Sequence, residues 1–166
     1  FLSITSFTSA ITTFVGQNLG AEEFDRAKKG ARFGILCSLL IAEGIGVITH
    51  VFSPVFIGAF CDSQEAIAFG VDKAHICALF FCLLAATHCL SAVLRGAGRA
   101  MVPMVVMLSV WCVLRVSILW IAVPITQSIN TVNWVYPITW SISTVVLLIY
   151  YRKSDWLHSF QREKAE

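Results

Sequence analysis

Long apolar segments alternate with short charged ones along this chain. Each apolar segment has roughly the 20 residues that an α-helix needs to cross the hydrocarbon core of a bilayer. The pattern predicts five spans, at about residues 1–15, 33–56, 74–94, 103–123 and 132–151. We therefore expect an all-α, polytopic transmembrane helix bundle, followed by a basic tail at 152–166.

Composition strengthens this prediction. Hydrophobic residues make up 57% of the chain and charged residues 13%, whereas soluble domains are about one quarter charged. The net charge of +2 is too small to indicate a nucleic-acid partner, so we expect a lipid bilayer around the protein. The chain begins at Phe1 inside an apolar stretch, which indicates a fragment of a longer protein rather than a signal peptide.

The basic residues predict an orientation. Ten of the twelve Lys and Arg residues lie in the first connector (16–32), in the turn RGAGRAMVP (95–103) and in the tail. By the positive-inside rule, we expect a multi-pass protein of the plasma (inner) membrane with its basic loops and C-terminus in the cytoplasm. Residues 20–32 could also form an amphipathic interfacial helix, because acids near their start and bases near their end suit the helix dipole.

Arg115 lies near the middle of the fourth apolar segment. A charge at that depth costs on the order of 3 kcal/mol, so its side chain should face protein or water. Two interpretations stay open: a transport or coupling residue, or a structural Arg held by carbonyl groups or a carboxylate. Trp111 lies four residues earlier on the same helical face, where a cation–π contact is possible.

Glu43 lies near the middle of the second apolar segment, beside Gly44 and Gly46. Buried carboxyl groups can bind a proton near neutral pH, which is the chemistry that a proton-coupled transporter needs. The alternatives are an ion pair with Arg115, which lies at a similar depth, or a neutral, hydrogen-bonded carboxyl group.

Thr87 and His88 are the other polar candidates, in the third apolar segment. A histidine there could titrate or bind substrate, although a lone histidine among apolar residues is more often a packing residue. The chain has no HExxH, GxSxG or Walker motif, and its six cysteines form no CxxC pair. We therefore expect no enzyme, no metal site and no cofactor.

Two stretches resemble motifs of the MATE (multidrug and toxic compound extrusion) transporters. FVGQNLGAEEFDRAKKGAR resembles the signature after the second helix of each lobe. LRGAGRAMVPM, followed by a Trp and an Arg, looks like the turn between the tenth and eleventh helices. These motif positions are Gly16, Gln17, Gly20, Ala21, Arg95, Gly96, Gly98 and Pro103.

This resemblance implies twelve helices in two lobes, with the present chain supplying helices eight to twelve of the C-terminal lobe. Family members export organic cations and other amphipathic compounds against inward flow of H⁺ or Na⁺, by alternating access between the lobes. The partners expected by resemblance are a cationic or amphipathic small molecule and an N-terminal lobe that is missing here.

The chain departs from the family pattern at two places. Leu84 stands where some members carry a cation-binding Asp, and Arg115 is followed by Val116 and Ser117 rather than by a residue and Pro. Three other functions remain possible: a flippase for lipid-linked glycans from the same superfamily, a membrane-embedded enzyme and a non-transporting membrane subunit.

Overall fold

The computed structural model describes residues 2–60 and 63–158, and every regular element in these ranges is helical. The all-α prediction is therefore confirmed. The elements are α1 (Leu2–Gly20), α2 (Phe24–Gly58), α3 (Gln64–Ala78), α4 (Phe81–Gly96), α5 (Met101–Met107), the π-helical η1 (Leu108–Leu114), α6 (Arg115–Thr126) and α7 (Ile129–Lys153).

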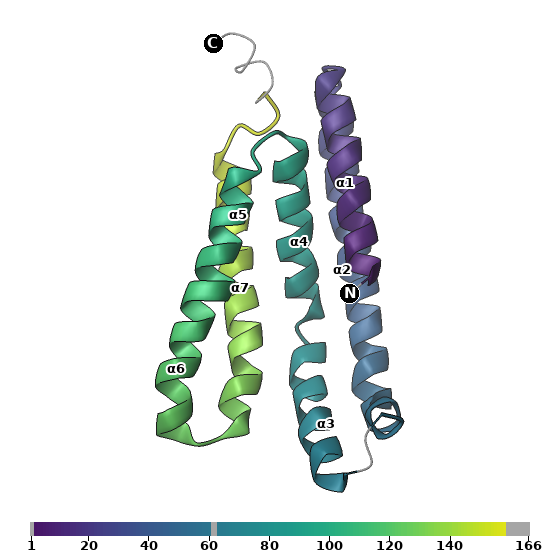
Figure 1. The fold of residues 1–166 in the computed structure, drawn as a ribbon. Helices are drawn as coiled ribbons and strands as arrows, with labels where there is room; N and C mark the ends of the chain where they lie inside the picture. Colours follow the sequence, from purple (N-terminus) through teal and green to yellow (C-terminus); the bar gives the residue numbers. More distant parts are fainter. Residues whose placement is uncertain (1, 61–62, 159–166) are drawn as a thin grey trace.

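These elements form antiparallel columns (Figure 1). α4 is central, because it packs against α1, α2 and α7. α3 and α4 together make one bent column, and α5, η1 and α6 make another without a break in the helix. The core consequently lies along α4, where residues from Cys89 to Leu94 are all buried.

The first connector is much shorter than the range 16–32 that the polar residues suggested. α1 continues to Gly20 and α2 begins at Phe24, so only three residues separate them. Glu22 makes the reversal with a φ of 60°. The following basic stretch is the start of α2, with Ala27 and Ala31 buried. This agrees with the amphipathic-helix alternative, in a helix that continues directly into the second apolar segment.

The third apolar segment, expected as one helix at 74–94, is broken in the structure. α3 and α4 meet at Leu79 and Phe80 with a bend of 56°. α2 lies against this break at Gly46, where a Cβ atom would be 2.5 Å from the carbonyl oxygen of Ala78. The close approach leaves no room for a side chain at that position of α2.

The fourth apolar segment also departs from a regular α-helix. Residues Leu108–Leu114 form a π-helical turn immediately before Arg115. Such turns widen a helix locally and often occur at functional sites. Trp111 lies within the widened turn, so the irregular backbone positions the aromatic neighbour of Arg115.

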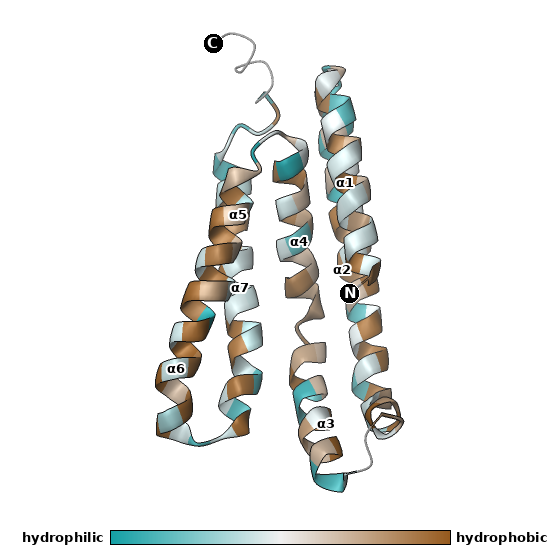
Figure 2. Cartoon of the chain, in the orientation of Figure 1, coloured by the Kyte–Doolittle hydropathy of each residue, from teal (hydrophilic) through white to brown (hydrophobic). Residues whose placement is uncertain are grey.

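The outer surface is rich in exposed apolar side chains. Brown, hydrophobic residues cover much of α5 and α6 (Figure 2), and Trp120 is 80% exposed. A soluble protein rarely exposes so large an apolar surface. Three described helices are long and apolar enough to cross a membrane, and four are if the bent α3–α4 pair counts as one span. These helices support a polytopic membrane protein, and the expected number of five spans stays a prediction.

The two ends of the bundle differ in charge. The turn at 21–23, the turn at 97–100 and the end of α7 lie at one end, whereas the turn between α6 and α7 lies at the other (Figure 1). The basic clusters of the first connector, the RGAGRA turn and the start of the tail thus share one end. Arg162 and Lys164, which belong to the predicted tail, lie outside the described residues.

Candidate functional site

The two motif stretches meet in space where α1 crosses α4. A Cβ atom on Gly96 would lie 2.6 Å from the carbonyl oxygen of Thr12, and one on Gly16 would lie 3.3 Å from the carbonyl oxygen of Gly96. The hydroxyl group of Thr12 can also donate to the carbonyl oxygen of Ala92 at 3.2 Å, in place of its bond to Thr8 in the same helix at 2.8 Å. Small residues and an interhelical hydrogen bond are typical of tightly packed membrane helices.

The other motif residues shape the ends of these helices. Gly98 has a φ of 78°, which only glycine adopts without strain. Pro103 is buried in the first turn of α5, where a missing amide hydrogen costs nothing. Arg95 is exposed beside α1 and lines a cavity of about 330 Å³ with hydroxyl groups from that helix. Three motif positions lie at the C-terminal end of α1 and in the turn after it: Gln17, Gly20 and Ala21.

Arg115 is held by α7 rather than by a carboxylate. Its Nε and Nη2 atoms donate to the hydroxyl oxygen of Thr139 at 3.1 and 2.6 Å. Its guanidinium carbon lies 5.3 Å from the ring centroid of Trp111 and 4.7 Å from that of Tyr136. The predicted contact with Trp111 is confirmed, whereas no ion pair joins Arg115 to Glu43 among the described residues.

A second cation shares the ring of Tyr136. The Nζ atom of Lys73, from α3, lies 4.6 Å from its centroid. Two positive groups from different columns therefore contact one aromatic ring of α7. Cation–π contacts of this kind stabilise a charge in a nonpolar environment.

Thr87 belongs to a buried hydroxyl cluster between α4 and α7. Its Oγ1 atom lies 3.1 Å from the Oγ atom of Ser143 and 2.8 Å from the Oγ1 atom of Thr144. The indole nitrogen of Trp111 donates to Ser143 at 3.3 Å. A chain of hydrogen bonds and ring contacts therefore connects Thr87, through Trp111, to Arg115.

His88 packs next to this cluster. Its ring meets that of Trp111 edge-on, with the centroids 5.4 Å apart. The structure thus brings three of the four candidates, Arg115, Thr87 and His88, around one tryptophan. The residues of α7 that complete the cluster could not be found from spacing, because they lie more than 20 positions away from these candidates along the chain.

Glu43 lies apart from that cluster. It faces the break between α3 and α4, where it lines a cavity of about 90 Å³ together with His50. The thiol of Cys82, at the start of α4, lies beside its carboxyl group. The separation from Arg115 follows from these neighbours, since Arg115 points toward α7.

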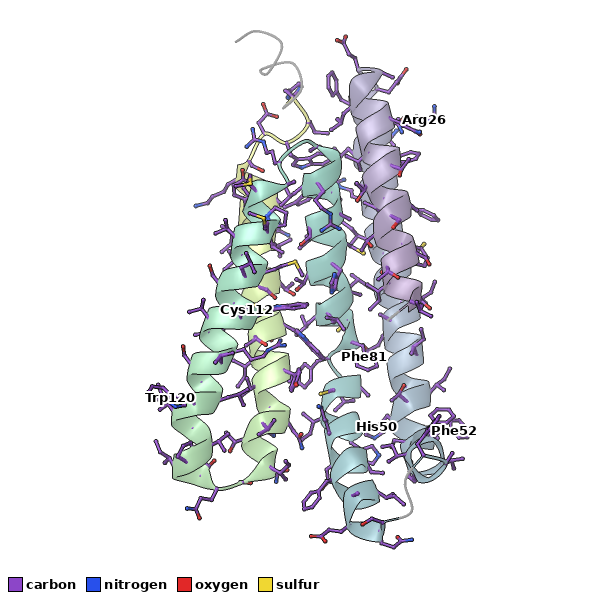
Figure 3. All side chains as sticks on the ribbon, in the orientation of Figure 1. Arg26, His50, Phe52, Phe81, Cys112 and Trp120 are labelled. Carbon is purple, nitrogen blue, oxygen red and sulfur yellow. The ribbon has the colours of Figure 1, made fainter. Side chains whose placement is uncertain are left out.

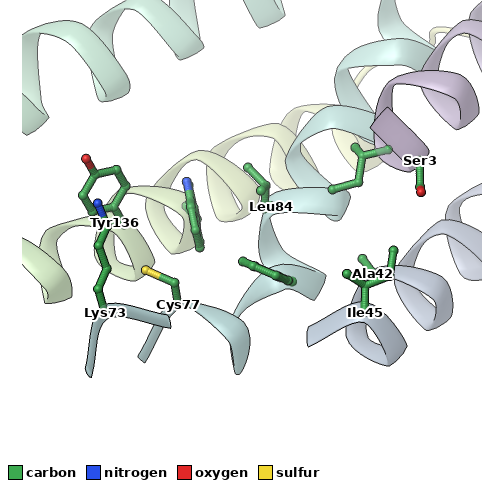
Figure 4. Close-up of a pocket in the computed structure, with 10 residues that line it drawn as sticks. Ser3, Ala42, Ile45, Lys73, Cys77, Leu84 and Tyr136 are labelled. Carbon is green, nitrogen blue, oxygen red and sulfur yellow. The ribbon is translucent and has the colours of Figure 1, made fainter. Parts of the chain in front are cut away.

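A cavity of about 310 Å³, larger than the one beside Glu43, occupies the interior between the columns (Figure 4). Its walls are mostly apolar and aromatic, with Phe81 and Trp140 among them, and Lys73 supplies a charge. Leu84 also lines this cavity, at the position where some transporters of the resembled family carry an acid. An apolar cavity with few polar groups is the usual form of a site for small molecules.

Comparison with known proteins agrees with the motifs. A family model described as MatE matches residues 1–121. The chain is 27% identical to "Probable multidrug resistance protein YoeA" of Bacillus subtilis (strain 168), over 86% of this chain and 31% of that protein. It is 29% identical to "Probable multidrug resistance protein NorM" of Thermotoga maritima, over 67% of this chain and 24% of that protein.

The chain therefore spans about a third or less of the length of these curated relatives. Their names point to transport rather than to catalysis. The match of the family model covers well over half of the chain, including the Gly16–Gly96 crossing, the π-helical turn and Arg115. On these grounds, the chain belongs to the MatE family of transporters.

Proposed function

We propose that this chain is the C-terminal lobe of a secondary efflux transporter. The complete protein would export organic cations and related drugs across the plasma membrane by antiport with H⁺ or Na⁺. Transport would proceed by alternating access between this lobe and an N-terminal lobe. The basic end of the bundle would face the cytoplasm, as the positive-inside rule predicts.

One observation carries the proposal: the 310 Å³ cavity adjoins two irregular helices. The broken α3–α4 column contributes Cys77 and Phe81 to its wall. The π-helical turn holds Trp111, whose neighbour Arg115 shares the ring of Tyr136 with Lys73. Breaks and π turns are places where a helix can change shape at low cost. A substrate in this cavity would consequently contact the broken α3–α4 column directly and the π-helical turn through Tyr136 and Arg115.

The aromatic walls suit the apolar part of an amphipathic substrate. Arg115 would position the residues of the site, because its hydrogen bond to Thr139 joins the π-helical column to α7. Thr87 and His88 would link the same cluster to α4. Binding that disturbs this cluster would therefore change the packing of three columns together.

The test uses the full-length protein in proteoliposomes with a fluorescent cationic dye. We expect dye transport to follow an imposed H⁺ or Na⁺ gradient. We expect R115K to lower its rate, because lysine cannot make two hydrogen bonds to one hydroxyl group from a planar head. S117A is the matched control, since the Ser117 hydroxyl group bonds only within its own helix. Dye movement that ignores both gradients would exclude the antiport mechanism.

A lipid-linked glycan flippase is the second candidate, and one observation favours it. Lys73 and Arg115 both contact Tyr136 at the cavity, and paired cations could receive an anionic head group. The same proteoliposomes, loaded with a fluorescent polyprenyl diphosphate lipid, discriminate between the two functions. A flippase would move this lipid between leaflets and would leave the dye where it was.

A further inference from the structure

The smaller cavity, between α2 and the α3–α4 break, holds two buried polar atoms without a hydrogen-bond partner among the described residues. They are the Oε2 atom of Glu43 and the Nδ1 atom of His50. Both residues line this cavity of about 90 Å³, and His50 lies where α2 faces α3 (Figure 3). An unpartnered buried polar group destabilises a fold, so the two atoms point to something that binds between them.

The cavity is large enough for water. A water molecule occupies about 30 Å³ in the liquid, so the space can hold a short chain of them. Glu43 and His50 lie seven positions apart on α2, which is about two helical turns. Water in the cavity would therefore connect the carboxyl group to the imidazole ring.

A second imidazole continues the path. The rings of His50 and His75 lie 4.3 Å apart with an angle of 35° between their planes. His75 comes from the last turn of α3. The contact between the two rings therefore extends the row of polar groups from α2 to α3.

We propose that Glu43, His50 and His75 form a proton-binding site at the α3–α4 break. A hydronium ion that reaches the site transfers its proton to one imidazole of the pair, which becomes an imidazolium ion, and leaves a water molecule. That ion releases the proton through the cavity water to the carboxylate of Glu43, which becomes a neutral carboxylic acid. The imidazole returns to its neutral form, and the charge balances at each step.

The neighbouring charged groups do not compete for this proton. On α4, the titratable group beside Glu43 is the thiol of Cys82. On α3, Lys73 directs its ammonium group toward Tyr136. α1 also packs on α2 and carries no charged side chain in its described length. Two acids lie exposed in α3, ahead of His75: Glu65 and Asp72.

The donor set favours a proton over a sodium ion. Hard cations prefer several oxygen ligands, whereas this site offers one carboxylate and two imidazoles. Among the described residues, no group of three or more His, Cys, Asp or Glu side chains is arranged to hold a metal ion.

The site also has a route to the larger cavity. On α2, Ala42 and Ile45 line the larger cavity, while Glu43 and Gly46 line the smaller one. On α3, the neighbours Cys77 and Ala78 divide in the same way. A change of charge at Glu43 therefore acts on two of the helices that line the larger cavity, α2 and α3. This coupling rests on the proposed function, and the proton site itself does not.

The experiment uses the full-length protein in proteoliposomes, with E43Q, H50Q and the control H158Q. His158 is exposed and pairs with Asp155, away from both cavities. We expect E43Q and H50Q to lower dye transport driven by a pH gradient on the order of tenfold, which corresponds to about 1.4 kcal/mol. Melting temperatures in detergent near that of the wild type would show that both variants are folded.

Infrared difference spectroscopy detects protonation of the site directly and does not depend on a transport assay. A pH step should change the C=O stretching band of a protonated carboxylic acid in the wild-type protein and in H158Q, and E43Q should lack that change. Unaltered pH-driven transport in E43Q and H50Q, or an unaltered band in E43Q, would overturn the proton site. If the band behaves as expected and no gradient drives the dye, the proposed function fails while the proton site stands.

Discussion

A charge inside a membrane protein needs partners, and Arg115 finds neutral ones. Its hydrogen-bond acceptor is the hydroxyl group of Thr139, which itself donates to the carbonyl oxygen of Val135 at 2.9 Å or of Tyr136 at 3.0 Å. The four-residue spacing to Trp111 predicted one contact. Thr139 could not be predicted, because it lies 24 residues away on another helix and nothing in its local sequence distinguishes it from other threonines.

We expect T139V to lower the free energy of unfolding by about 1–3 kcal/mol, because it leaves the half-buried guanidinium group of Arg115 without its acceptor. Thermal unfolding of the full-length protein in detergent measures this effect. S141A is the control, since the Ser141 hydroxyl group bonds only to Pro137 within α7. Equal melting temperatures for T139V and S141A would show that Thr139 does not support Arg115.

The glycines of the motifs give a second prediction at this scale. We expect G96A to destabilise the protein by about 1–3 kcal/mol, because its methyl group would press on the backbone of α1 at Thr12. G44A, whose Cβ would meet nothing within 4 Å, should stay within about 1 kcal/mol of the wild type. The same thermal measurement compares them, and a G96A protein as stable as G44A would contradict the close helix crossing.

At the scale of elements, the apolar segments predicted where helices form better than where those helices break or end. The stretch ICALFFCLL contains the break at Leu79 and Phe80 without a glycine or proline to announce it. The break depends on packing against Gly46 of α2, which no local pattern shows. At 16–32 the polar residues predicted a connector where most of the residues are helical. A helix can continue through exposed charges when its other face stays buried, as Ala27 and Ala31 do.

Cysteine labelling tests whether α2 begins at Phe24. In a background without native cysteines, we expect K28C and K29C to react quickly with a water-soluble maleimide. A27C and A31C should react slowly, because Ala27 is 0% and Ala31 1% exposed. Uniform labelling at the four positions would indicate a loop instead of a helix.

At the scale of the whole molecule, the charge pattern and the topology agree. The odd number of apolar segments predicted basic connectors on one side, and the antiparallel columns bring those connectors to one end (Figure 1). The two cavities inside the bundle could not be predicted from the sequence. The larger cavity combines residues from five helices, and the smaller one joins α2 to the end of α3. Such combinations depend on how the columns pack.

Sidedness is the corresponding prediction. In sealed, right-side-out vesicles that contain the full-length protein, we expect an impermeant maleimide to label N130C but not K28C. Both positions are exposed and lie at opposite ends of the bundle. Permeabilising the vesicles should then allow K28C to react, which controls for its reactivity. Labelling of K28C in intact vesicles would reverse the orientation.

The crossing of α1 over α4 has a mechanical consequence. The backbones touch at Gly16 and Gly96, so these two helices cannot slide past each other without first separating. We therefore expect them to move as one rigid pair. The break beside Phe81 and the π-helical turn around Cys112 lie at a similar level of the bundle (Figure 3), beyond the end of this rigid pair. We therefore expect any movement between the columns to take place at the break and at the π-helical turn, and a ligand bound there to hinder it.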